Sequence, residues 1–131
     1  MNDTTRIRLL TVSEHTSEPA RPVVALANDE DPHDRKNEIA AAARVELHFP
    51  NFTDGRAYSQ AYLLRRRLGF KGDLRATGDV LVDQLIQMER TGFSSAVLKE
   101  GIDPNEARHQ LDRFPAFYQS DVIQDAPFRR S

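Results

Sequence analysis

Residues 43–49 read ARVELHF, and their side chains alternate between apolar and polar. The apolar side chains that would share one face of a strand are Val45, Leu47 and Phe49. Glu46 and His48 would lie on the opposite face. A parallel strand covered by helices on both faces is normally an almost continuous apolar run. The alternation therefore predicts a strand with one apolar and one polar face, and Pro50 ends it.

A second stretch of the same kind is GDLRATG, residues 72–78. Arg75 would lie at the centre of its polar face, where an unpaired charge is costly. Glu46 on a neighbouring strand, or Asp73 on the same face, could supply the compensating carboxylate. Arg75 would then belong to a structural ion pair. The alternative is that Arg75 binds a ligand in a shallow polar groove.

Outward from these two strands, strand-like and helix-like segments alternate along the chain. The expected strands are residues 22–27, 43–49, 72–78 and 94–100, and the helices between and after them begin near Asp31, Tyr58, Asp79 and Asp103. Four βα units predict an α/β fold of parallel strands joined by right-handed crossovers, with helices mainly on one face. Two arrangements remain open. One is half of a barrel, and the other is a three-layer sheet in which the two polar-faced strands lie at the edges.

The length of 131 residues corresponds to a single domain. We expect this α/β domain over residues 22–119, after a leader (1–21) that could be partly disordered and before a C-terminal tail (120–131). The leader has a linker-like composition, although Ile7–Val12 (IRLLTV) could form a short strand. Its removal is therefore expected to change stability little, unless that strand pairs with the sheet.

The composition excludes several classes of protein. The chain has no cysteine, which excludes disulfides, thiolate zinc sites and cysteine-bound iron–sulfur clusters. No apolar run is long enough to span a membrane, and the net charge of −2 disfavours non-specific binding to nucleic acid. The four histidines show no metal-binding spacing. We predict a cytoplasmic protein with no cofactor, no metal, no membrane and no nucleic-acid partner.

Candidate binding residues follow the two alternating strands, because ligands of parallel α/β folds bind beyond the carboxyl ends of strands. They are Asp54, Gly55, Arg56, Gly78 and Asp79. A glycine beside a helix start lets backbone N–H groups approach an anion. The structural alternative is that Asp79, and Asp54 or Ser59, cap the following helices.

Two further candidates, Asp83 and Gln84, lie one turn into the helix that begins near Asp79. They could reach back toward Arg56 or Arg75. Otherwise Asp83 stabilises the positive end of its own helix.

Residues 49–84 also carry a recognisable pattern. Its positions are Phe52, Asp54–Arg56, Tyr58–Ser59, Ala61, Leu64–Arg65, Gly69–Phe70, Gly72, Leu74–Ala76, Gly78–Val80 and Asp83–Gln84, with Arg113–Phe114 and Tyr118–Gln119 later in the chain. This pattern resembles the bacterial family called domain of unknown function 934 over most of residues 22–119. Tyr58 and Ser59, which belong to this pattern, are also candidate ligand-binding residues.

The resemblance implies a link to assimilatory sulfate and sulfite reduction. Sulfite reduction normally relies on a haem-type macrocycle coupled to a cysteine-bound cluster, and this chain has no cysteine. Its six glycines contain no G-x-G-x-x-G dinucleotide motif. An accessory role fits better, through binding of a small oxyanion or of enzymes of that pathway.

The alternative is a small βα-type enzyme acting on a phosphorylated or sulfur-oxyanion metabolite, with Asp54, Arg56, Arg75 and Asp79 at its site. Whether the chain is an enzyme stays open at this point. Parallel strands rarely leave one face in water. We therefore also expect a homodimer that covers the polar face.

Overall fold

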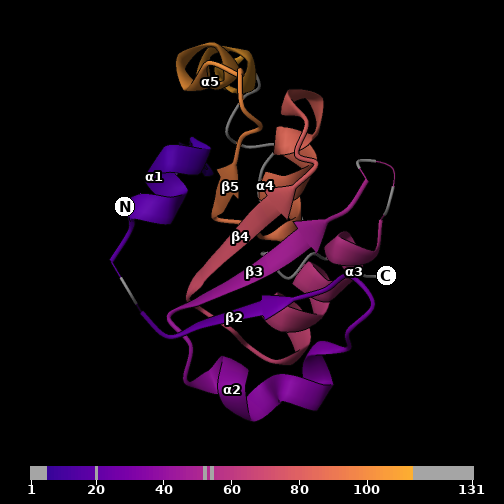
Figure 1. The fold of residues 1–131 in the computed structure, drawn as a ribbon. Helices are drawn as coiled ribbons and strands as arrows, with labels where there is room; N and C mark the ends of the chain where they lie inside the picture. The colour runs from indigo at the N-terminus through magenta and orange to yellow at the C-terminus, as the bar shows by residue number, and fades with distance from the viewer. Residues whose placement is uncertain (1–5, 20, 52, 54, 114–131) are drawn as a thin grey trace, which may run out of the picture.

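The computed structural model describes residues 6–19, 21–51, 53 and 55–113, which form an α/β fold around a parallel sheet (Figure 1). Its five strands are β1 (Arg8–Leu10), β2 (Val23–Leu26), β3 (Arg44–Phe49), β4 (Asp73–Gly78) and β5 (Ser95–Val97). They lie in the order β1-β5-β4-β3-β2, and every neighbouring pair is parallel. The predicted α/β fold of parallel strands is confirmed. The count of four βα units is approximate, because β1 adds a fifth strand.

The helices alternate with these strands. They are α1 (Val12–Ser17), α2 (Lys36–Ala40), α3 (Arg56–Tyr62), α4 (Leu85–Thr91) and α5 (Pro104–Asp112). A 3-10 turn (Pro32–Arg35) leads into α2 and another (Val82–Gln84) into α4, while a π-helical turn (Leu63–Arg67) extends α3. Asp103 caps α5 by accepting a hydrogen bond from the Asn105 backbone at 2.9 Å.

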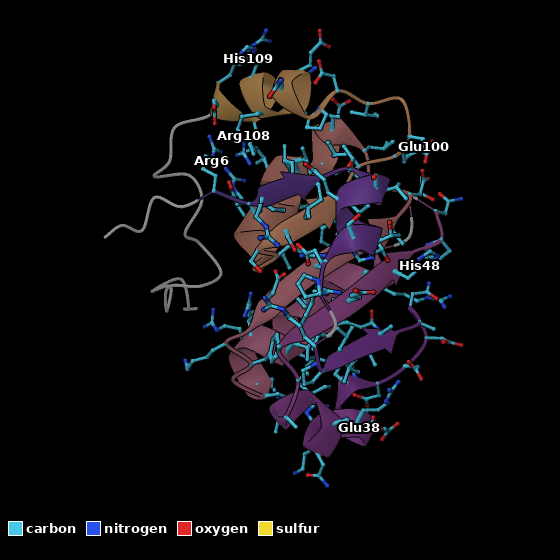
Figure 2. All side chains as sticks on the ribbon, turned by 60° about the vertical axis from the view of Figure 1, so that its left-hand side comes forward. Arg6, Glu38, His48, Glu100, Arg108 and His109 are labelled. Carbon is cyan, nitrogen blue, oxygen red and sulfur yellow. The ribbon has the colours of Figure 1, made fainter. Side chains whose placement is uncertain are left out.

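The direction in which the chain crosses the sheet places the helices. From β2 to β5, each strand lies next to its predecessor and the chain moves in one direction. Right-handed crossovers then put α2, α3 and α4 on one face. The connection from β1 to β2 runs in the opposite direction, and the same handedness puts α1 on the other face. Figure 1 shows α3 and α4 behind the sheet, and Figure 2 shows α1 in front of it.

The hydrophobic core lies between the apolar sheet face and the helices that cover it. The strands contribute the buried side chains Val24, Leu26, Val45, Leu47, Phe49, Leu74, Ala76 and Ala96. The helices and the π-helical turn contribute Ile39, Ala57, Ala61, Leu64, Leu85, Met88, Ala107 and Leu111. In contrast, α1 has no buried residue. Helices therefore lie mainly on one face, as predicted. The alternative that β3 and β4 are edge strands is wrong, because β1 and β2 form the edges.

Residues 6–19 join the fold through β1 and α1. Arg8–Leu10 pairs with Ser95–Val97, so Ile7–Val12 does contain the short strand that its composition allows. Ile7 is 1% exposed, and its backbone N–H donates to Glu89 Oε2 at 2.7 Å. The division into leader, domain and tail stays a prediction. Among the residues that the structure describes, no helix is both long and apolar enough to cross a membrane.

Deletion of residues 1–20 should destabilise the protein, contrary to what the linker-like composition predicts. It removes β1 from the sheet, and with α1 it removes His15 and Glu18, which contact the buried Arg75. Arg75 would keep Asp73 and Ser95 but lose its other two partners. Breaking a buried ion pair costs up to about 3–5 kcal/mol. Urea unfolding followed by circular dichroism should show a lower free energy of unfolding. The exposed-site variant Ser13→Ala is the control, and an unchanged midpoint in the truncated chain would contradict the structure.

Candidate functional site

Arg75 lies at the centre of the polar sheet face, and its side chain is 0% exposed. Its Nε donates to Ser95 Oγ at 2.8 Å, and its Nη1 donates to His15 Nδ1 at 2.9 Å. Its Nη2 donates to Asp73 Oδ2 at 3.0 Å and lies 3.1 Å from Glu18 Oε1. Two carboxylates therefore compensate the buried guanidinium. Of the two interpretations of Arg75, these contacts agree with the structural ion pair.

Only one of the two expected carboxylates pairs with Arg75. Glu46 lies beside Arg75 in the register of the sheet. However, Glu46 Oε2 accepts a hydrogen bond from Arg44 Nε at 2.9 Å. Glu18, which comes from the end of α1, takes its place and also contacts Arg44 Nη1 at 2.8 Å. We call Arg8, Arg44, Arg75, Asp73 and Glu18 the arginine network.

Both carboxylates of the network are held in their charged form. Burial alone would raise the pKa of Asp73, but hydrogen bonds from Ser94 and Ser95 and the charges of Arg75 and Arg8 outweigh it and lower the pKa. Burial would also raise the pKa of Glu18, and the surrounding arginines again lower it, Arg75 most strongly. Asp73 and Glu18 thus stay ionised at neutral pH.

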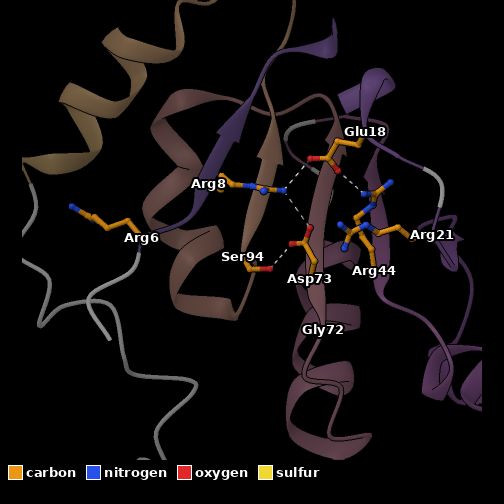
Figure 3. A pocket seen from close by; sticks show the side chains of 8 residues that line it. All are labelled: Arg6, Arg8, Glu18, Arg21, Arg44, Gly72, Asp73 and Ser94. Atoms are coloured by element: carbon orange, nitrogen blue, oxygen red, sulfur yellow. Dashed lines mark hydrogen bonds and ion pairs between the residues drawn. The ribbon is translucent and has the colours of Figure 1, made fainter. Parts of the chain in front are cut away.

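A depression of about 440 Å³ opens beside the network, at the amino-terminal ends of the strands (Figure 3). It is lined by Arg6, Arg8, Glu18, Arg21, Arg44, Gly72, Asp73 and Ser94. We call it the arginine pocket, because four arginines line it. Arg6 pairs with Glu89 and Asp112, so that Arg8, Arg21 and Arg44 remain beside two lining carboxylates. In Figure 3, Arg8 extends toward Glu18 and Asp73, while Arg6 points away from them.

Two arginines of the pocket can reach a ligand from solvent. Arg8 is 58% exposed, although its Nη2 lies 3.2 Å from Glu18 and 3.8 Å from Asp73. Arg21 is exposed, and no hydrogen bond or ion pair joins it to another residue in the described part of the chain. Arg21 and Arg44 both line the pocket (Figure 3). The pocket therefore carries an excess of positive charge that faces water.

The residues predicted after β3 lie at the opposite end of the sheet. Gly55 and Arg56 are exposed at the start of α3, and Ser59 is exposed within it. No side chain caps α3, so Ser59 does not have that role. Asp54 lies outside the described residues.

The residues predicted after β4 make structural contacts. Gly78 has a φ of +93°, which only glycine adopts readily. Asp79 does not cap the next helix, whose N-cap is Leu81. Its carboxylate instead accepts a hydrogen bond from Lys99 Nζ at 2.8 Å. The loops after β4 and β5 are thereby linked.

The remaining candidates belong to the helices. The ring of Tyr58 packs edge-on against Phe49, with ring centroids 5.2 Å apart. Its hydroxyl is buried and makes no hydrogen bond within the described residues, and burial raises the pKa of Tyr58 to about 12. Asp83 is exposed and Gln84 half-buried in the turn before α4. Within the described residues, no hydrogen bond or ion pair joins Arg75 to Asp83 or Gln84. Whether these residues bind a ligand stays a prediction.

Arg8, Arg21, Arg44 and Glu18 are not among the residues that the sequence predicts for a site. A site was expected at the carboxyl ends of the strands, where ligands of such folds usually bind. A usable signal was present nevertheless. β1, β3 and β4 each begin with a charged residue, namely Arg8, Arg44 and Asp73. Because the strands are parallel, their first residues lie at the same end of the sheet.

The described residues do not bring three histidine, aspartate or glutamate side chains together in a group that could hold a metal ion. The lining of the pocket is richest in guanidinium groups. These groups donate paired N–H bonds to carboxylates and oxyanions. This is therefore a small α/β protein with a basic, solvent-open depression at the amino-terminal ends of its strands.

The family of this protein agrees with the resemblance in its sequence. Residues 23–129 match the family described as bacterial protein of unknown function, DUF934, and the chain belongs to that family. No curated protein and no solved structure matches the chain. The matched range contains Arg44 and Asp73, but it begins after Arg8, Glu18 and Arg21. The arginine pocket is thus built in part from residues outside the match.

Acid should destabilise the protein through Asp73 and Glu18. Their pKa values lie below the ordinary 3.8 and 4.5 in the folded state. The stabilisation is complete above these ordinary values and is lost as the pH falls through the lowered, folded-state values. Urea unfolding at a series of pH values from about 6 to about 2 should show this loss. Asp73→Asn should be less stable at neutral pH and lose less on acidification. An equal loss in parent and variant would contradict the assignment.

Proposed function

We propose that this protein is an accessory of assimilatory sulfite reduction that binds a small oxyanion in the arginine pocket. The observation that carries the proposal is that two exposed arginines, Arg8 and Arg21, line one depression in which arginines outnumber carboxylates. The resemblance to the family supplies the link to sulfite reduction, and it makes sulfite and sulfate the first anions to test.

The arginine network supports binding because it holds one of the two exposed donors, Arg8, in place before a ligand arrives. Glu18 contacts Arg8, Arg44 and Arg75, and Asp73 contacts Arg75 and Arg8. Side chains fixed in this way lose little conformational entropy when an anion binds. Arg8 and Arg21 can then present N–H groups to the oxygens of one small anion.

The polar lining favours a small hydrated anion over a larger organic ligand. Apart from Gly72 and Ser94, every lining residue is charged. Such a surface offers charge and hydrogen bonds but little apolar area to cover. Because Glu18 and Asp73 offset part of the positive charge, we expect reversible rather than very tight binding.

A cytoplasmic location and a homodimer are further parts of the proposal. α1 of the same chain already covers Arg75, so a dimer is not required to bury it. Exposed residues of the polar face remain beside α1, including Val23, Ala25 and His48. A second copy could pack on this part of the face.

Anion binding can be tested by thermal unfolding and titration calorimetry with sulfite, sulfate and phosphate at constant ionic strength. Binding should stabilise the folded state by about 2.7 kcal/mol when the free anion is at a hundredfold excess over Kd. Arg21→Gln should abolish most of this gain without loss of stability, since Arg21 is exposed. Chloride at the same ionic strength is the control ligand.

The matched control variant is Arg113→Gln, an exposed arginine at the end of α5 that removes the same charge. It should bind the anion as the parent does. Equal stabilisation of parent and Arg21→Gln, or no stabilisation of the parent by any of the three anions, would contradict the proposed function.

A further inference from the structure

A second depression, of about 650 Å³, lies between α2 and the segment of residues 67–72 that leads into β4. In Figure 1, α2 lies below the sheet. Ile39, Leu68 and Phe70 give it an apolar lining. Ile39 and Phe70 are 3% and 9% exposed, so they belong to the core and present only part of their surface.

Three cations surround this apolar lining. Lys36, Arg67 and Lys71 all line the depression and are exposed, and no aspartate or glutamate lines it. None of the three makes an ion pair with another residue in the described part of the chain. The acidic residue of α2, Glu38, pairs instead with Arg35. We call this depression the basic groove.

One wall of the basic groove is held in a fixed shape by Arg65. Arg65 Nη1 donates hydrogen bonds to the carbonyl oxygens of Phe70 and Gly72, both at 2.9 Å. Its guanidinium carbon also lies 5.6 Å from the centre of the Phe70 ring. Such contacts preform the wall, so a ligand would not need to order it on binding.

We propose that the basic groove docks an acidic, amphipathic segment of a protein partner. Apolar side chains of that segment would cover Leu68 and Phe70, while its carboxylates would meet Lys36, Arg67 and Lys71. A bare oxyanion would leave the apolar lining uncovered. A nucleic acid favours a broad basic surface, whereas the neighbouring arginine pocket contains two carboxylates and the chain carries a net charge of −2.

This proposal is independent of the oxyanion proposal. The two depressions share Gly72 among their lining residues, but the cations differ. Failure of the parent to bind sulfite would therefore leave the basic groove unaffected. Reversal of a charge in the groove should likewise leave sulfite binding largely intact.

The test uses the full chain and a fluorescein-labelled synthetic peptide of about 14 residues, patterned as an amphipathic helix with leucines on one face and glutamates on the other. Fluorescence anisotropy should detect binding that weakens as salt rises. The double variant Lys36→Glu/Lys71→Glu should lose at least about tenfold in affinity. Both residues are exposed, so its thermal unfolding should stay close to that of the parent. Arg113→Glu, which reverses one charge at α5, should bind as the parent does.

Two control peptides separate charge from apolar contact. A peptide with lysine in place of glutamate, and one with serine in place of leucine, should both bind at least about tenfold more weakly. The proposal would be overturned by equal binding of the serine peptide, by equal binding to the double variant, or by no binding of the acidic peptide up to about 1 mM.

Other occupants of the groove give distinct results. Self-association of the parent that is lost in the double variant would assign the groove to a second copy of this chain. Stronger binding of single-stranded DNA or of anionic lipid vesicles, dependent on Lys36 and Lys71, would assign it to those ligands. Each of these results would overturn the proposal of a protein partner.

Discussion

The guanidinium of Arg75 is buried at the centre of a parallel sheet, and its surroundings make that position tolerable. Asp73 comes from the same strand and Ser95 from the neighbouring strand, but His15 and Glu18 come from the segment that crosses the polar face. A buried charge without such partners would cost several kcal/mol. Arg75 needs hydrogen-bond and ion-pair partners, and His15 and Glu18 supply two of them. These contacts hold α1 against the central strand β4.

The same arrangement explains why the arginine pocket opens at the amino-terminal ends of the strands. Asp73 and Arg44 are the first residues of β4 and β3, and Glu18 directly follows α1. These three charges therefore lie at the same end of the sheet. At the carboxyl ends of the strands, loops are linked by contacts such as that between Lys99 and Asp79. The exposed arginines of this pocket thus lie at the end of the sheet where ligands of α/β proteins are less commonly found.

The alternation in residues 43–49 and 72–78 was sufficient to predict two strands, their apolar faces and helices mainly on one side. It did not predict that both strands lie inside the sheet rather than at its edges. The Asp–Pro helix starts at residues 31 and 103 were also readable, because capping depends on adjacent residues. The pairing of β1 was not readable, since a strand of three residues carries little pattern and its partner lies far along the chain. For the same reason the contacts of Glu18 with three arginines could not be derived. They depend on a crossing that only the three-dimensional path of the chain defines.

The position of β1 also has a consequence for how the chain can fold during synthesis. Arg8 pairs with Ser95, so β1 leaves the ribosome long before its partner strand exists. At about 5–20 residues per second, roughly 4–17 s separate the two events. During this interval β2, β3 and β4 can assemble in the order in which they emerge, while Arg75 still lacks Ser95. Closure of the sheet by β1 is then a late, long-range step, and the nascent protein stays exposed to chaperones and proteases until it is complete.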